Sequence, residues 1–112
     1  MEFKNLKRGE YSKINGSHLV GRVNVSYQDL IQSFGLPHGS DGYKSDAEWA
    51  LEFEDGTVAT IYNWKNGKNY LGAHGSSLND IEEWHVGGFN QDSVDRVMDT
   101  IKTGVGSCAN YA

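Results

Sequence analysis

A basic and aromatic stretch in the middle of the chain carries the residue types that bind phosphorylated ligands. Lys65 and Lys68 flank an Asn-Gly pair within a long segment that contains no acidic residue. Asn-Gly favours a two-residue hairpin turn, and that hairpin places Asn63 and Tyr70 together on the face that also carries both lysines. Ammonium groups suit phosphate, and an aromatic plane suits a base. These four side chains form the first candidate ligand site. The alternative is that the lysines only protect a sheet edge from association.

Two other segments are weaker candidates for ligand contact. The glycine-rich segment 35–44 ends in Lys44 and can offer backbone N–H groups and one cation to an anion. Trp84 and His85 precede a pair of glycines, and glycine at such a place often marks the close approach of a ligand or another backbone. The alternatives are an ordinary solvent loop and a strand-to-helix turn with Trp84 in the core.

No pattern in the sequence requires catalysis or a metal. Histidine occurs at His18, His38, His74 and His85, without the spacings of metal ligands. Glu82 and Glu83 are adjacent, so on a strand they point to opposite faces. Cys108 lies in a glycine-containing tail with no ordered base predicted beside it. We therefore expect neither an enzyme nor a bound metal or cofactor.

The central elements are predicted by alternation of apolar and polar residues. Trp49, Leu51 and Phe53 alternate with small or acidic residues before a turn at Asp55-Gly56. A two-residue turn there pairs Phe53 with Val58 and places Tyr62 on the apolar face. Continuing through Asn66-Gly67 gives a three-strand meander with Leu71 beside Tyr62. Further strands are expected at 11–14 and 17–25, joined at Asn15-Gly16, and at 81–86.

Two amphipathic helices are expected to cover one face of the sheet. The first begins at the N-cap Ser26, with Asp29 in the capping-box position, and ends at Gly35. The second follows the cap Asn90 and ends at Gly104. The predicted fold class is α+β, an antiparallel sheet in the order β-β-α-β-β-β-β-α with both helices on one face. The predicted core is Trp49, Phe53, Val58, Tyr62, Leu71, Leu30, Ile31, Phe34, Val97, Met98 and Ile101.

Composition limits the class of protein. With 112 residues, the chain is expected to form a single domain over 1–112, with 1–9 and 103–112 loosely ordered. Aromatic residues make up 12% of the chain, which argues against disorder. The net charge of −5 disfavours binding to nucleic-acid backbone. A single cysteine and the lack of a long apolar run predict a cytoplasmic protein that does not contact membranes. Unpaired sheet edges and the surplus of aromatic residues predict a homodimer or higher homo-oligomer.

Three segments together resemble a family of small proteins of tailed bacteriophages. They are Asp46-Ala47-Glu48-Trp49, the run from Phe53 to Lys65, and Trp84-His85-Val86-Gly87-Gly88. The likeness covers about residues 44–88. It brings no activity and no catalytic residue, but it implies an accessory or anti-defence role exercised by binding.

Three hypotheses about function follow. The first is a protein that sequesters a small anionic, nucleotide-like signalling ligand through Lys44, Asn63, Lys65, Lys68, Tyr70, Trp84 and His85. The second is an acidic protein inhibitor that mimics nucleic acid and blocks a host immune nuclease such as a CRISPR effector. The third, which we favour least, is a small hydrolase with a His/Asp or His/Glu pair. A phage protein of any of these kinds acts in the host cytoplasm.

Overall fold

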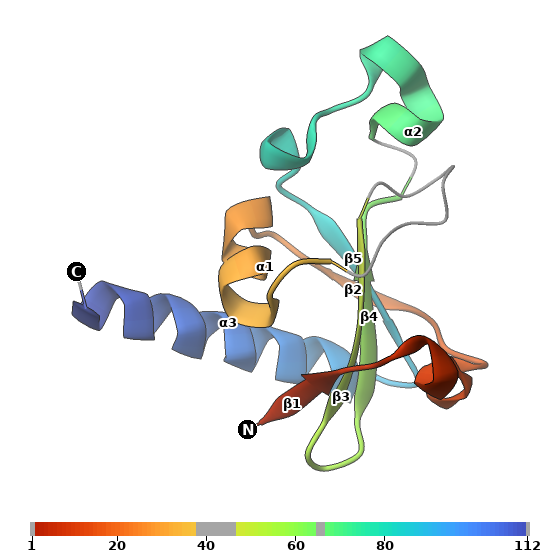
Figure 1. Cartoon of the computed structure of the whole chain (residues 1–112), viewed down its shortest axis with the longest axis vertical. Coiled ribbons are helices and arrows are strands. Elements are labelled where there is room, and N and C mark those ends of the chain that lie inside the picture. The colour runs from red at the N-terminus through yellow and green to blue at the C-terminus, as the bar shows by residue number, and fades with distance from the viewer. Residues whose placement is uncertain (1, 38–46, 65–66, 112) are drawn as a thin grey trace.

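The computed structural model describes residues 2–37, 47–64 and 67–111. Its elements are β1 (Phe3–Asn5), η1 (Arg8–Ile14), β2 (His18–Val23), α1 (Tyr27–Phe34), β3 (Glu48–Phe53), β4 (Val58–Tyr62), α2 (Lys68–Leu71), η2 (Gly72–His74), η3 (Leu78–Asp80), β5 (Trp84–Gly88) and α3 (Asp92–Tyr111), where η denotes a 3₁₀ helix. The strands form one antiparallel sheet in the order β1-β3-β4-β5-β2 (Figure 1). The predicted α+β class is confirmed.

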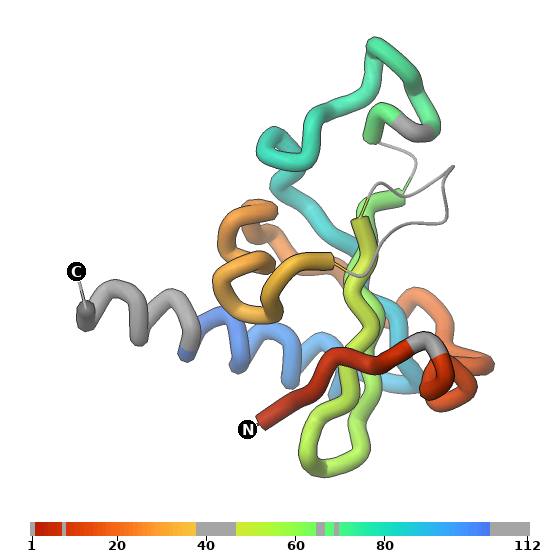
Figure 2. The backbone as a smooth tube through the Cα atoms, in the orientation of Figure 1, coloured from red at the N-terminus to blue at the C-terminus, as the bar shows by residue number. Residues whose placement is uncertain are grey.

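Helices α1 and α3 lie on the same side of the sheet, and the core fills the space between (Figures 1 and 2). The side chains of this core that are almost fully buried are Val23, Leu30, Phe34, Ala47, Trp49, Leu51, Phe53, Ala59, Ile61, Ile81, Trp84, Val86, Val97 and Ile101. We call the opposite side of the sheet the outer face. Most of the predicted core is confirmed, with the exceptions described below.

The ends of α1 follow the sequence signals. The Ser26 hydroxyl accepts a hydrogen bond from the Asp29 N–H at 3.1 Å, and the Asp29 carboxylate accepts one from the Ser26 N–H at 3.4 Å. This reciprocal pair is the predicted capping box. At the other end Gly35 has a φ of +85° and its N–H bonds to the Ile31 carbonyl at 2.8 Å. Helix α3 begins as expected, with the Asn90 side chain accepting from the Asp92 N–H at 2.9 Å, but it extends to Tyr111, beyond the predicted end at Gly104.

The register of the central hairpin differs from the prediction by one residue. Glu52, not Phe53, is opposite Val58, so the loop has three residues and Gly56 takes a φ of +88°. A type I turn followed by one left-handed residue gives this geometry. Because side chains alternate, the shift moves Val58 and Tyr62 from the core to the outer face and brings Ile61 into the core. Val58 is still buried there, at 6% exposure, whereas Tyr62 is partly exposed.

The predicted third strand of the meander is absent from the described residues. Lys68–Leu71 is the short helix α2, and Leu71 is 43% exposed instead of buried beside Tyr62. An isolated β-bridge joins Gly67 and Ser76. The backbones are so close here that a Cβ at Gly75 would collide with the Gly67 carbonyl. We call residues 67–76 the arm; it lies at one end of the sheet (Figure 1).

The prediction of an N-terminal hairpin at Asn15-Gly16 is also wrong. Residues before this pair form η1, which lies against the outer face, and β2 pairs with β5 instead. No strand was expected in 1–9, yet β1 pairs with β3, with Phe3 opposite Phe53. Lys13 holds η1 to the sheet through an ion pair of 2.9 Å with Glu52. The two residues are 39 positions apart, so local turn signals do not predict their pairing.

Candidate ligand site on the outer face

The side chains of the predicted hairpin-tip site are not brought together by a hairpin. Asn63 is fully buried, and its amide oxygen accepts a hydrogen bond from the Ala47 N–H at 3.1 Å. Lys68 and Tyr70 are exposed on α2, so Tyr70 does not pair with Asn63 across a strand. Lys44 and Lys65 lie outside the described residues.

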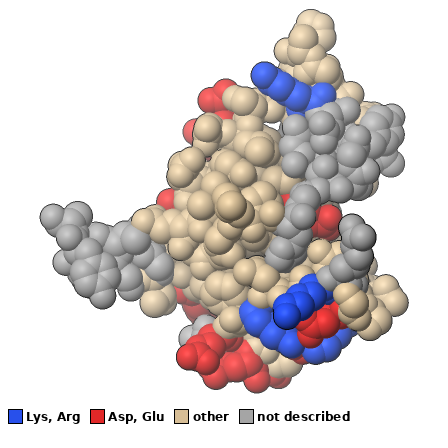
Figure 3. Space-filling model, viewed as in Figure 1, with Lys and Arg blue, Asp and Glu red and all other residues tan. Residues whose placement is uncertain are grey.

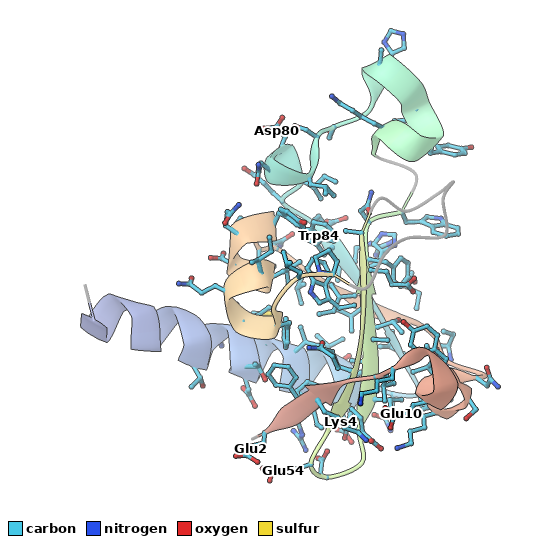
Figure 4. All side chains as sticks on the ribbon, in the orientation of Figure 1. Glu2, Lys4, Glu10, Glu54, Asp80 and Trp84 are labelled. Carbon is cyan, nitrogen blue, oxygen red and sulfur yellow. The ribbon has the colours of Figure 1, made fainter. Side chains whose placement is uncertain are left out.

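Trp84 and His85 point to opposite faces of β5. Trp84 is fully buried in the core, where its ring stacks on Tyr27 at 6.0 Å and meets Trp49 edge-on at 5.6 Å (Figure 4). Its indole N–H is buried and has no hydrogen-bond partner among the described residues. Only His85, which is half-buried, is placed on the outer face for contact with a ligand.

The glycine pair after His85 is explained by packing within the protein. A Cβ at Gly87 would collide with the Thr60 hydroxyl, and a Cβ at Gly88 would collide with the Ser93 side chain. The Ser93 hydroxyl donates a hydrogen bond of 2.6 Å to the Val58 carbonyl. These glycines allow β5 to approach neighbouring protein atoms closely. They therefore do not indicate a ligand site.

Strand pairing creates a polar row that the sequence did not suggest. Arg22 on β2 is opposite His85 on β5, His85 is opposite Tyr62 on β4, and Tyr62 is opposite Glu48 on β3. Directly opposed residues of antiparallel strands point to the same face. The four side chains therefore cross four strands in one line on the outer face, which we call the outer row.

The aromatic members of the outer row are in contact. The rings of Tyr62 and His85 meet edge-to-face, with centroids 5.6 Å apart and planes at 83°. Trp64 follows β4 and meets Tyr62 in the same way at 6.0 Å, with 40% of its surface exposed. The outer row thus has an aromatic surface beside it. At its other end, the Arg22 Nε lies 3.6 Å from a carboxylate oxygen of Glu83.

The electrostatics of the outer row keep its central groups uncharged at neutral pH. Burial, and secondly the Arg22 guanidinium, lower the pKa of His85 below its ordinary 6.5, with Glu83 acting in the opposite direction. Burial, and secondly the charge of Glu48, raise the pKa of Tyr62 above 10.0, with Arg22 opposing. The row therefore offers neutral hydrogen-bonding groups between a guanidinium and a carboxylate.

A cavity at the other end of the sheet has the wrong charge for an anion. It lies beside β1, has a volume of about 370 Å³, and is lined by Glu2, Phe3, Lys4, Glu52, Phe53, Glu54 and Gly56. Three carboxylates against one ammonium disfavour a phosphorylated ligand. Figures 3 and 4 show acidic side chains gathered near the β3–β4 turn, with Glu2 and Glu54 beside each other.

The described part of the chain has neither a metal-binding cluster nor a membrane-spanning helix. No three or more His, Cys, Asp or Glu side chains gather there as metal ligands would. None of the helices in the described ranges combines the length and the apolar character needed to span a bilayer.

Sequence comparisons assign the chain to no family. No protein-family model matches it, and no curated protein resembles it significantly. The resemblance to proteins of tailed bacteriophages therefore stays a prediction.

Proposed function

We propose that the protein captures a small anionic, nucleotide-like ligand on the outer row. The observation that carries this proposal is the alignment of Arg22, His85 and Tyr62 across neighbouring strands, with Trp64 next to them. A guanidinium binds phosphate through two parallel hydrogen bonds, and an exposed aromatic ring stacks on a base. The imidazole and the phenol add donors and acceptors that can recognise the sugar or the base edge.

The resemblance to phage proteins suggests a biological role for this binding. A phage protein that removes a nucleotide signal from the host cytoplasm disarms the defence that depends on the signal. One ligand bound per site, without a cofactor, is sufficient for such a role. We propose this anti-defence activity as the biological setting of the site.

The acidic-inhibitor alternative has less support from the charge arrangement. Glu52 lies 2.9 Å from Lys13 and 3.6 Å from Lys4, and Asp55 lies 2.9 Å from Arg96. A mimic of nucleic acid needs a surface of uncompensated negative charge, whereas these carboxylates are paired. Helix α3 does carry exposed acidic residues, Asp92, Asp95 and Asp99. A pull-down from host lysate tests whether this surface binds a host protein.

A homodimer is part of the proposal. β1 and β2 are the two edges of the sheet, and an unpaired edge is a template for another strand. Large apolar side chains near β2 are also exposed, with Leu19 at 43% and Phe89 at 49%. Light scattering at micromolar protein should give about twice the chain mass of 12.4 kDa, and the monomer mass would contradict the proposal.

Calorimetry with a panel of mono-, di- and cyclic nucleotides tests the site. One charge-assisted hydrogen bond contributes about 1.5–3 kcal/mol, so Arg22→Ala should weaken binding roughly 10- to 150-fold. Lys102→Ala is the matched control, because Lys102 is an exposed cation on α3. A panel without any binder would contradict the proposal.

A second pair of variants separates the outer row from the arm. If the double variant Lys65→Ala/Lys68→Ala binds about 100-fold more weakly while Arg22→Ala has no effect, the ligand binds at the two lysines and not at the outer row. In that case the hypothesis drawn from the sequence is right and the outer row is not the site.

A further inference from the structure

Glu48 and His85 stand on either side of Tyr62 in the outer row. Each is directly opposite Tyr62 on a neighbouring strand, so their backbones are two strand spacings apart, about 10 Å. Both side chains are partly exposed on the same face. A carboxylate and an imidazole separated in this way can contact the two sides of a phosphodiester held over the Tyr62 ring.

A guanidinium completes the set that phosphodiester chemistry requires. Arg22 is opposite His85, at the end of the row away from Glu48, and its side chain is 53% exposed. Breaking a P–O bond by an internal nucleophile needs a base for the attacking hydroxyl, an acid for the leaving oxygen, and a cation for the charge on the phosphoryl oxygens. All three kinds of group are present on the outer face.

We propose that the captured ligand is a ribonucleotide phosphodiester and that the outer row cleaves it by intramolecular transphosphorylation. This inference rests on the proposed function and adds a substrate class and a reaction to it. It assigns the base to Glu48, the acid to His85 and the stabilisation of the phosphoryl charge to Arg22.

The reaction balances without a co-reactant. The Glu48 carboxylate takes the proton of the ribose 2′-hydroxyl, and the 2′-oxygen forms a bond to phosphorus. The bond from phosphorus to the 5′-oxygen breaks, and that oxygen receives the proton of the His85 imidazolium. The products are a 2′,3′-cyclic phosphate and a 5′-hydroxyl, and exchange of protons with water restores both side chains.

The surroundings of His85 set the pH range of this reaction. Among the described residues, the charged and titratable groups that face it are Arg22, Glu83 and Tyr62 at neighbouring positions, with Glu48 beyond Tyr62. Burial and Arg22 together lower the pKa of the imidazole, so its protonated form is a stronger acid than an ordinary imidazolium but is scarce at pH 7. The cleavage rate should therefore fall as the pH rises through a value below 6.5.

The test uses the full chain with a short single-stranded RNA of mixed sequence and its 2′-O-methyl analogue. Mass spectrometry detects the cyclic phosphate end, and calorimetry with the analogue measures binding without cleavage. Glu48→Gln and His85→Gln are compared with the controls Glu82→Gln and His18→Gln, which change exposed residues outside the outer row. Circular dichroism of every variant confirms that it is folded.

We expect wild type and both controls to cleave the RNA but not the analogue, and each outer-row variant to be at least about 100-fold slower. If the analogue binds and the RNA stays intact at every pH from 5 to 8, cleavage is refuted while the proposed binding function stands. If neither oligonucleotide nor any mononucleotide binds, the proposed function itself fails. Cleavage that survives both outer-row variants would show that these residues do not perform it.

Discussion

Gly88 offers a sharp test of how the sheet and α3 fit together. Alanine in place of a strand glycine normally stabilises a protein by about 0.5–1 kcal/mol, because glycine has more backbone freedom to lose. At Gly88 the added carbon would collide with the Ser93 hydroxyl and Cβ and lie 3.2 Å from the Val58 carbonyl oxygen. The sign of the effect is therefore decided by packing.

The magnitude follows from two terms. Overfilling a buried site costs about 1–3 kcal/mol, and displacing Ser93 breaks its buried hydrogen bond to Val58, which contributes about 1 kcal/mol. After the gain in backbone entropy is subtracted, Gly88→Ala should lower the free energy of unfolding by about 2 kcal/mol. Urea unfolding followed by the fluorescence of the buried Trp49 and Trp84 measures this value.

Two variants make the test specific. Gly9→Ala is the matched control, since a Cβ there meets nothing within 4 Å, and its stability should equal or exceed that of wild type. In a Ser93→Gly background, Gly88→Ala should cost at least about 1 kcal/mol less, because the colliding atoms are gone. A Gly88→Ala protein within 0.5 kcal/mol of wild type would refute the packing described for this strand.

Three further predictions concern charge and hydrogen bonding. The hydrogen bond from Lys4 lowers the pKa of Glu10 from 4.5 to about 2, so its stabilising contribution is complete above pH 4.5 and is lost as the pH falls toward 2. Urea midpoints measured across that range should fall less steeply for Glu10→Gln than for wild type. NMR titration should give His85 a midpoint below 6.5, and Arg22→Ala should raise that midpoint; an unchanged midpoint would contradict the influence of the guanidinium. Asn63→Ala should lower the free energy of unfolding by about 1–3 kcal/mol, because it leaves a buried backbone N–H unsatisfied. Unchanged urea stability of that variant would contradict a structural role for the amide.

The sequence predicts those parts of the fold that depend on neighbouring residues. The capping of α1 by Ser26 and Asp29, its end at Gly35, and the burial of Trp49 and Phe53 are all confirmed. Each depends on a local hydrogen bond or on the alternation of side chains along one strand. Such features are determined within about four residues of the chain.

The hairpin register could not be predicted because Asp55-Gly56 suits two different turns. A two-residue turn and a three-residue loop both place glycine at a positive φ, and the sequence does not distinguish them. The difference of one residue decides which face Tyr62 occupies. The wrong choice concealed its place in the outer row.

The outer row itself depends on topology. Arg22, Glu48, Tyr62 and His85 come from four strands, and only the pair on β3 and β4 belongs to one hairpin. His85 was a candidate from the sequence because of the glycines that follow it, although those glycines have a packing role. Arg22 and Glu48 carry no local signal, since an isolated charged residue on a strand is common on protein surfaces.

The strand order has a consequence for how the protein is made. Of the strands in the described ranges, only β3 and β4 are joined by a short loop. β1 pairs with a strand almost 50 residues further along, and the partner of His18 is Gly88, about 70 residues later. At roughly 5–20 residues per second of synthesis, β2 leaves the ribosome several seconds before β5 exists. During that interval β2 lacks β5, the strand with which it pairs. We therefore expect the β3–β4 hairpin to form first. Variants that slow its closure, such as Gly56→Ala, should prolong the time for which the N-terminal third is accessible to proteases and chaperones.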